Sequence, residues 1–449
     1  MSSYLNKQAP PPPPPKAGGP APPSATASSD PAPPSGRTKP SHRHKQSIHY
    51  NDAPDLAALA DSAAAGGGGG GVTRARSKTT NRASRVPALG AIPASTALAT
   101  PSTSASMTGR GTEAEVTLPA FDAPPPPPPL PISSIRTGPR SLPYDVTHFP
   151  VPSLTIKLVL LFIPGNPGLV GYYDSFLSNV QASLPNDIRD TTEIYAVGHL
   201  GHSLQAEKEG MVKGFKPSQQ ATLEEQVESK LEFVDELRGK YGQDVKIMAM
   251  GHSIGSWICL QMLKQRPQLV ASAHLLFPTI SSMSLTPNGR KLSPLFSSWT
   301  LRPLFYSTSF FSYLPTSLVS TLVSVLTGQS GPGSATTTRL VSSPQTVVAA
   351  ITMARHEIDC VRELDRDLVR AVGDKCWWYW AEAGRDGWVL EESIREIEAA
   401  LGDARGIAAK RERCSEGMPH AFVLNQEHTA SLARKCAGWI VKDLETRDE

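Results

Sequence analysis

Residues 245–263, VKIMAMGHSIGSWICLQML, join a short apolar run to a helical apolar pattern through the turn Gly-His-Ser-Ile-Gly. This order predicts a buried strand that turns directly into a helix. Gly251 and Gly255 flank Ser253, and we expect glycine there because the strand and helix backbones would crowd any Cβ atom. A serine placed this way lies at the carboxyl edge of a parallel sheet, so the segment predicts an α/β fold.

The chain after residue 142 repeats this alternation of strand and helix. Apolar runs such as LTIKLVLLFI predict central strands that are covered on both faces. Thr222 and Glu225 predict a capping box at the start of an amphipathic helix that ends at Gly239 or Gly242. The fold class is therefore α/β, with a mostly parallel sheet covered by helices on both faces. Strands are expected within 154–168, which ends in a Pro-Gly turn, and within 193–202, which ends in a Gly/His loop, and also at 245–250, 269–278 and 376–384. The expected helices are 171–184, 221–242, 256–265, 391–401 and 427–444.

Residues 1–141 differ in composition from the rest of the chain. They hold six prolines at 10–15, six more at 124–129 and six glycines at 66–71, with few large apolar residues. Such a segment cannot bury enough apolar surface to offset the entropy cost of ordering, so we expect it to be disordered. Residues 142–449 have a globular composition and are long enough for one full-sized α/β domain.

Composition also bears on the partners of the chain. The stretch FDAPPPPPPLP is typical of polyproline II ligands of SH3, WW, EVH1 or profilin-type modules, although a passive spacer is the favoured interpretation. The formal net charge is only +3, so we expect no strong electrostatic partner such as a nucleic acid. We also expect no cofactor and no metal ion.

The cysteines and the apolar runs indicate the compartment. The five cysteines are scattered and form no CxxC motif, which predicts reduced thiols in a cytosolic protein. The N-terminus has no apolar core of a signal peptide, so secretion is not expected. No run of 18 apolar residues occurs, so no membrane span is predicted.

The pattern Gly-x-Ser-x-Gly is weak evidence by itself in a chain rich in glycine and serine. The segment GHLGHSLQ, residues 198–205, offers a comparison, because Ser203 also follows Gly-His. There the residue two positions after the serine is Gln205, and no helical apolar pattern follows at once. Ser203 is therefore interpreted as a loop residue, and Ser253 is the candidate nucleophile.

A nucleophilic serine needs a histidine as base and a carboxylate that orients the histidine. On this fold they follow in the order Ser, Asp or Glu, His. Asp386 comes just after the strand expected at 376–384, and His420 precedes the last expected helix. The sequence therefore predicts a triad of Ser253, Asp386 and His420.

Other residues fit this order less well. Glu382 and Asp359 are rival acids, and Asp386 could serve only as a turn former before Gly387. His428 falls inside the expected last helix, and His356 precedes Asp386 along the chain.

The negative oxygen formed when the serine attacks needs N–H donors that are already in place. One is the backbone N–H of Ile254, directly after the nucleophile. The second should come from the loop IPGNPG after the first long strand, where Asn166 is preferred and Gly165 is the alternative.

Several sequence segments, in the same order along the chain, together resemble a known protein family. The chain resembles the lipid droplet-associated hydrolases, a branch of the α/β-hydrolases, over about residues 155–440. The segments that carry the resemblance are FIPGNPGLVGYYDSF, GHLGH, GHSIGSW, LLFPTISSMSLTPNG, RDGW and MPHAFVL. The proline-rich N-terminal region is not part of this pattern.

The resemblance implies a Ser-Asp-His triad, which falls on Ser253, Asp386 and His420. It also implies a location on the cytosolic face of lipid droplets, or on the endoplasmic reticulum. The implied reaction is hydrolysis of lipid esters such as sterol esters or acylglycerols through an acyl-enzyme. The alternative function is a droplet scaffold that keeps the fold without significant turnover.

Residues 281–345 interrupt the strand–helix alternation and are expected to form an insertion or lid. Within them, residues 303–338 contain no charged side chain. Such an apolar helix could contact a lipid monolayer or pack as a lid on the pocket, and it lacks the Lys- and Arg-rich face of typical interfacial helices. Six residues are expected to form one apolar helix face, Leu318, Val319, Leu322, Val323, Val325 and Leu326.

Overall fold

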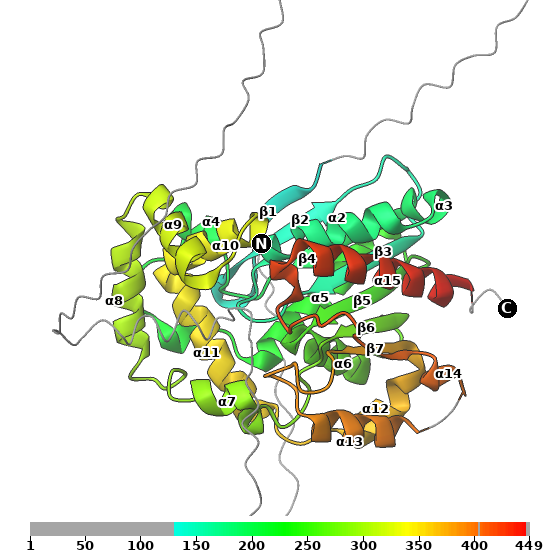
Figure 1. Ribbon diagram of the computed structural model, residues 1–449. Helices are drawn as coiled ribbons and strands as arrows, with labels where there is room; N and C mark the ends of the chain where they lie inside the picture. Colours follow the sequence, from blue (N-terminus) through cyan, green and yellow to red (C-terminus); the bar gives the residue numbers. More distant parts are fainter. Residues whose placement is uncertain (1–129, 403–404, 446–449) are drawn as a thin grey trace, which may run out of the picture. The chain divides into compact units, whose positions relative to one another are not determined.

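The computed structural model describes residues 130–402 and 405–445, so most of the region expected to be disordered lies outside it (Figure 1). One eight-stranded sheet has the strand order β1-β2-β4-β3-β5-β6-β7-β8. β2 pairs antiparallel with β1 and β4, and the strands from β4 to β8 are parallel. The strands are β1 Ile132–Thr137, β2 Pro143–Phe149, β3 Leu158–Ile163, β4 Thr192–Val197, β5 Lys246–His252, β6 Ser272–Leu276, β7 Cys376–Trp380 and β8 Arg411–Arg413.

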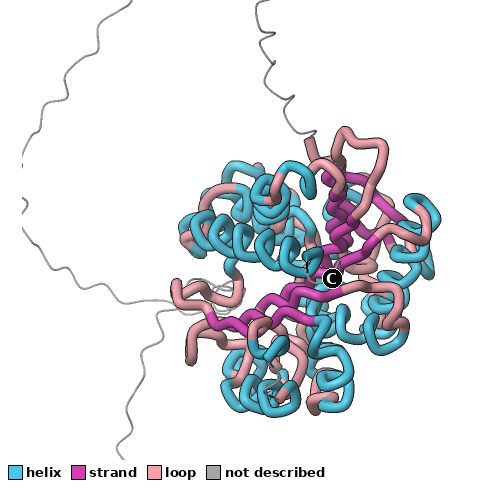
Figure 2. Tube along the Cα trace, turned by 90° about the vertical axis from the view of Figure 1, so that its right-hand side faces the viewer, coloured by secondary structure: helices cyan, strands magenta, loops and turns pink. Residues whose placement is uncertain are grey.

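Helices cover both faces of the sheet (Figure 2). Alternate residues of β3 face opposite sides, with Leu161 in one buried cluster and Leu160 in the other. The first cluster includes side chains of α5 (Leu223–Tyr241), α6 (Ile254–Gln265), α12 (Arg366–Val372) and α13 (Glu391–Leu401). The second includes side chains of α2 (Asp174–Ser183) and α15 (Gln426–Glu445). The α/β-hydrolase fold expected from the sequence is therefore confirmed.

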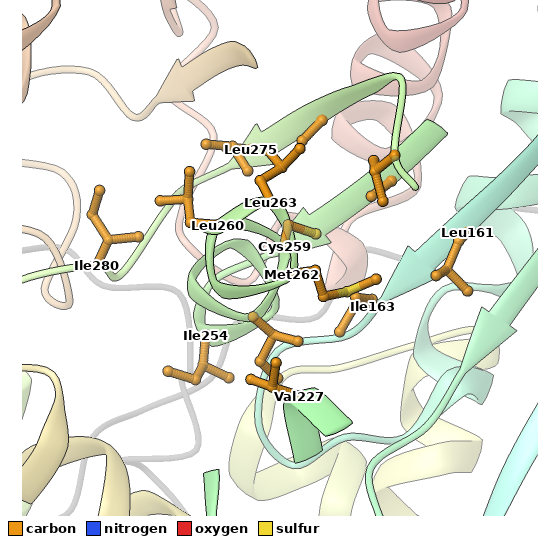
Figure 3. Packing of buried hydrophobic residues seen from close by; sticks show 14 of the residues in the cluster. Leu161, Ile163, Val227, Ile254, Cys259, Leu260, Met262, Leu263, Leu275 and Ile280 are labelled. Atoms are coloured by element: carbon orange, nitrogen blue, oxygen red, sulfur yellow. The ribbon is translucent and has the colours of Figure 1, made fainter. Parts of the chain in front are cut away.

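Helix α6 is anchored against the sheet by its apolar residues. Figure 3 shows Ile254, Cys259 and Met262 of this helix among side chains of the strands and of α5. All three are fully buried. Because the helix is held this firmly, the turn at its N-terminus has a fixed place at the carboxyl edge of the sheet.

Several expected elements match closely, and helix α13 matches at both ends. Helix α5 begins at the expected capping box, in which both the Thr222 and the Glu225 side chains make their bonds, and it ends at Gly242 rather than Gly239. The strands expected within 154–168 and 193–202 end before their turn and loop, with β3 ending at Ile163 and β4 at Val197. The ranges 269–278 and 376–384 were too long, because β6 ends at Leu276 and β7 at Trp380, whereas 245–250 was too short, because β5 continues to His252.

The expected start of the folded domain at residue 142 was wrong, because β1 lies ten residues earlier and β2 follows it. β1, ISSIRT, is mostly exposed and lies at the end of the sheet among the described strands, beside β2, so it carries no run of buried apolar residues. The three-residue strand β8 was missed because it is short and charged. The remaining short helices are α3 Asn186–Arg189, α4 Leu204–Lys208 and α14 Arg405–Ala408.

The expected insertion is helical and is followed by one longer helix. Helices α8, α9 and α10 lie together at the left of Figure 1, and α7 lies below them. They are α7 Pro287–Leu292, α8 Leu301–Ser312, α9 Thr316–Thr327 and α10 Pro332–Val341, and then α11 Pro344–Cys360. In residues 130–402 and 405–445 no helix combines the length and the apolar character that crossing a membrane requires.

The prediction that the apolar residues of 318–326 form a single helix face was wrong. Val319 and Val323 are buried, whereas Leu318 and Val325 are exposed. α9 packs on α10, and Val319 and Val323 are its buried apolar side chains, whereas its other apolar side chains are exposed to solvent. The helix thus has two apolar sides, which a count of apolar residues does not distinguish.

Candidate active site

Ser253 occupies the sharp turn between β5 and α6. Its backbone has φ 56° and ψ −123°, a conformation that a residue with a Cβ rarely adopts. A Cβ at Gly255 would lie 2.2 Å from the carbonyl oxygen of Ile163, and one at Gly251 would lie 2.4 Å from that of Gly255. The two glycines are therefore required by close backbone contact, as the sequence predicted, and Ser253 projects from the carboxyl edge of the sheet.

The structure brings Ser253, His420 and Asp386 into one hydrogen-bonded line. His420 Nε2 lies 2.9 Å from Ser253 Oγ, and His420 Nδ1 lies 2.8 Å from Asp386 Oδ2. A carboxylate oxygen can only accept, so Nδ1 carries the proton and Nε2 is free to accept from the serine hydroxyl. The other oxygen of Asp386 accepts from the Trp388 backbone N–H at 2.7 Å, which fixes the carboxylate.

The three residues come from three separate loops at one edge of the sheet. Asp386 follows β7, and His420 lies between β8 and α15. Parallel strands present their carboxyl ends at the same edge, which is why residues 167 positions apart can meet. His420 is buried and Ser253 is half-buried.

The rival residues lie elsewhere. Glu382 is exposed and pairs with Arg385, and Asp359 is exposed at the end of α11. His356 and His428 lie within helices α11 and α15. Ser203 has an ordinary extended backbone, and its Oγ accepts from the Ala206 N–H at 3.0 Å as the cap of α4.

The loop IPGNPG lies against the nucleophile, since a Cβ added to Gly165 would be 2.9 Å from the Cβ of Ser253. The Gly165 N–H donates to the Tyr173 hydroxyl at 3.1 Å, which disfavours this alternative as an oxyanion donor. Asn166 remains the preferred residue of this loop. Ile254 is the first residue of α6, so its N–H has no acceptor within the helix.

The Asn166 side chain holds this loop against α11. Its Nδ2 donates to the Ala350 carbonyl at 2.9 Å and to Glu357 Oε1 at 2.8 Å. Burial raises the pKa of the Glu357 carboxyl to about 7, while the Asn166 hydrogen bond and the nearby His420 act in the opposite direction. Sequence reasoning missed Glu357, although an acid on the inward face of an apolar helix, four residues after the buried Met353, could have indicated it.

Tyr173 and His252 were also missed as partners of the site. Both Tyr173 and His252 are buried beside the triad. Among the side chains that the structure describes, no group of three or more His, Cys, Asp or Glu could hold a metal ion.

Comparison with known proteins places the chain among hydrolases. Residues 156–423 match the family model described as lipid-droplet associated hydrolase. The lipid droplet-associated hydrolase of Gallus gallus is 30% identical over 298 residues, which cover 64% of this chain and 86% of that protein. The protein of the same description from Homo sapiens is 30% identical over 296 residues, 62% of this chain and 84% of the relative. The solved peroxisomal alpha-beta-hydrolase of Saccharomyces cerevisiae is 12% identical, with a TM-score of 0.46 over 71% of this chain and 88% of that one.

Proposed function

We propose that this chain, which belongs to the lipid droplet-associated hydrolase family, is a serine hydrolase that cleaves carboxylic esters of neutral lipids. The observation that carries the proposal is the line from Ser253 through His420 to Asp386, with distances of 2.9 and 2.8 Å. A serine that only shaped a turn would not need a buried histidine in contact with its Oγ and a fixed carboxylate behind that histidine.

In the proposed reaction, Ser253 Oγ attacks the acyl carbon while His420 Nε2 takes the hydroxyl proton. The negative oxygen of the tetrahedral intermediate accepts from the backbone N–H groups of Ile254 and Asn166. Asp386 stabilises the imidazolium through Nδ1. His420 then gives the proton to the departing alcohol, and an acyl-enzyme remains. Water attacks this ester by the same route, which releases the acid and restores the serine.

For the substrates we propose esters such as sterol esters and acylglycerols, and for the location the lipid droplet. The relatives from Gallus gallus and Homo sapiens are both described as lipid droplet-associated hydrolases. The insertion offers a second support, because its outer helices expose apolar side chains that soluble proteins seldom leave in water as a continuous patch.

We call these side chains the outer apolar face. Tyr306 and Phe310 of α8 and Tyr313, which caps that helix, recur at helical spacing, and the exposed apolar residues of α9 repeat this spacing. No charged side chain occurs from residue 303 to 338, so this surface suits the apolar boundary of a lipid monolayer rather than an acidic headgroup layer. The outer apolar face consists of Trp299, Tyr306, Phe310, Tyr313, Leu318, Leu322, Val325 and Leu326, all exposed.

In the same proposal, the insertion 281–345 acts as a lid. α11 follows the insertion and holds Asn166. Movement of the insertion on a lipid surface would therefore alter the surroundings of the reacting serine.

A second candidate is a droplet-bound scaffold with little turnover. The outer apolar face favours it, because attachment through α8 and α9 does not require the triad. The hydrolase requires Ser253 as its nucleophile, whereas the scaffold does not, so substitution of Ser253 distinguishes the two functions.

The first test uses a fluorophosphonate probe, which reacts with activated serines. The purified wild-type chain should be labelled, and Ser253→Ala should lose the label. Persistent labelling of Ser253→Ala would overturn the assignment of the nucleophile.

The second test measures products from emulsified sterol esters and acylglycerols, with Ser253→Ala as the blank. Release of fatty acid above the blank supports the lipid ester hydrolase. Droplet binding without any product above the blank would favour the scaffold, and turnover of short soluble esters alone would exclude the proposed substrates.

A further inference from the structure

Two buried side chains that the proposed reaction does not use connect the parts of the site. His252 directly precedes the nucleophile, and Tyr173 precedes α2. His252 Nδ1 lies 2.8 Å from the Tyr173 hydroxyl, and His252 Nε2 lies 3.0 Å from the carbonyl oxygen of His420. The Tyr173 hydroxyl also accepts from the Gly165 N–H at 3.1 Å. A series of three hydrogen bonds thus runs from the loop IPGNPG, which we call the oxyanion loop, to the loop that holds His420.

The two groups at the ends of this hydrogen-bond series, the Gly165 N–H and the His420 carbonyl, fix the donor and acceptor of every bond in it. The His420 carbonyl can only accept, so His252 Nε2 carries a proton. In a neutral imidazole Nδ1 must then accept, and the Tyr173 hydroxyl is its donor. The phenolic oxygen is left to accept from Gly165, whose N–H can only donate. Each group makes the bond that its chemistry allows.

The surroundings favour this single arrangement. Burial, together with the neighbouring His420, holds the pKa of His252 well below its usual value, so the ring stays neutral. Burial also raises the pKa of Tyr173, which keeps its proton. The His252 ring lies edge-on to Phe277 and Phe422, with centroids 6.0 and 5.2 Å away. Hydrogen bonds in such an apolar setting are strong, and a broken one leaves an unpaired polar group.

We infer that Tyr173 and His252 are positioning residues, which hold the oxyanion loop and the loop of His420 in register on either side of Ser253. The inference rests on the proposed function, since it assigns these residues a task in the proposed reaction. Neither side chain needs to touch the substrate. Gly165 is covalently joined to Asn166, the proposed oxyanion donor, and the His420 carbonyl belongs to the same residue as the base.

The consequence is kinetic. In the proposed transition state, charge develops at the oxyanion and at the imidazole together, on opposite sides of the serine. A loop that shifts by a fraction of an ångström weakens this stabilisation more than it weakens ground-state binding. Loss of the bridge should therefore lower kcat and leave KM nearly unchanged.

The test compares two neighbouring tyrosines in the full chain, on a soluble short-chain ester. Tyr173→Phe removes only the bridging hydroxyl. Tyr172→Phe is the matched control, because its hydroxyl is also held by a buried side chain but bonds Thr337 of α10, outside the bridge. We expect kcat to fall roughly tenfold in Tyr173→Phe with KM changed less than twofold, and kcat within twofold of wild type in Tyr172→Phe. An equal effect of both variants on kcat, or none from Tyr173→Phe, would overturn the inference.

Variants of His252 test the bridge in two ways, by partial rescue of activity and by energetic coupling to Tyr173. His252→Gln keeps a donor that can reach the His420 carbonyl, so it should lose less activity than His252→Phe. The double variant Tyr173→Phe/His252→Phe should be no slower than His252→Phe alone, because the bridge is already broken. Full additivity of the two effects would contradict a shared bridge.

The proposed function and the bridge can fail separately. Ser253→Ala in the same assays reports on the proposed function alone. The bridge has a readout that needs no turnover, which is the ¹⁵N NMR signature of the His252 ring. It should show a proton on Nε2 and none on Nδ1, and the opposite tautomer would overturn the bridge whatever the activity.

Discussion

The carboxyl edge of the sheet and the outer apolar face differ in how their side chains are paired. At the sheet edge, His420 is 8% exposed and makes a hydrogen bond through each ring nitrogen. On α8 and α9, Phe310 is 62% exposed and Val325 is 76% exposed, on a segment without charge. One region holds its polar atoms in hydrogen bonds of 2.8 and 2.9 Å, and the other leaves apolar surface open to solvent.

The difference corresponds to two physical tasks. Bond cleavage depends on distances between reacting atoms, so its residues lie at strand ends and are held by buried partners. Attachment to a fluid lipid surface depends on apolar area and needs no fixed geometry. Substitutions at the sheet edge should therefore change the reaction rate, and substitutions on the outer apolar face should change binding.

The largest expected effect is that of Asp386→Asn. The amide can no longer hold His420 in the tautomer that accepts from Ser253, so kcat on a soluble ester should fall by roughly 10⁴-fold. Flotation with artificial droplets should be unchanged. A loss of activity below tenfold, or a loss of flotation, would contradict the separation of the two regions.

Replacement of Phe310, Val325 and Leu326 by serine tests the other region. Each side chain would lose about 1 kcal/mol of apolar transfer energy, so the droplet partition coefficient should fall by roughly a hundredfold or more. Activity on a soluble ester should remain within twofold. The matched control replaces Leu130, Leu154 and Leu285, which are also exposed but lie outside α8 and α9. Equal loss of binding in the control would remove the outer apolar face from the proposal.

The two regions also differ in how well the sequence predicted them. The fold and the meeting of Ser253, Asp386 and His420 could be predicted, because strand–helix alternation and chain order determine which loops share an edge. The partners of Glu357 and His252 could not be predicted, since they lie on loops whose approach to these two residues depends on packing. On α9, composition alone could not separate the buried Val319 from the exposed Val325. β1 was missed because an exposed edge strand carries no buried apolar run.

Glu357 connects the two regions, since α11 follows the insertion and bonds Asn166. Burial raises the pKa of the Glu357 carboxyl from its usual 4.5 to about 7 in the folded chain. The protonated carboxyl is therefore compatible with burial at low pH, and its contribution to stability is lost as the pH rises from about 4.5 through 7. Glu357→Gln keeps an acceptor for Asn166 but never ionises. Its unfolding free energy should exceed that of the wild type by roughly 2–3 kcal/mol at pH 8.5.

At pH 5 the two proteins should have nearly equal unfolding free energies. Urea unfolding at both pH values measures the difference. Parallel pH dependences of the two proteins would show that the Glu357 carboxyl does not titrate in this range. Flotation of Glu357→Gln should match the wild type, because the outer apolar face is unchanged.

The smallest expected effect is that of Ser203→Ala. This variant tests whether a serine at the sheet edge that lies outside the triad affects kcat. Ser203 caps α4 and donates to Asp145 Oδ1, but it makes no contact with the triad. Loss of the cap should lower the unfolding free energy by about 1 kcal/mol and leave kcat within twofold of wild type. Ser203→Gly, which costs a helix cap only a few tenths of a kcal/mol, separates the cap from the Asp145 bond. A fall in kcat of Ser203→Ala as large as that expected for Asp386→Asn would contradict this expectation. It would show that kcat depends on the stability of the whole sheet edge rather than on the hydrogen bonds between Ser253, His420 and Asp386.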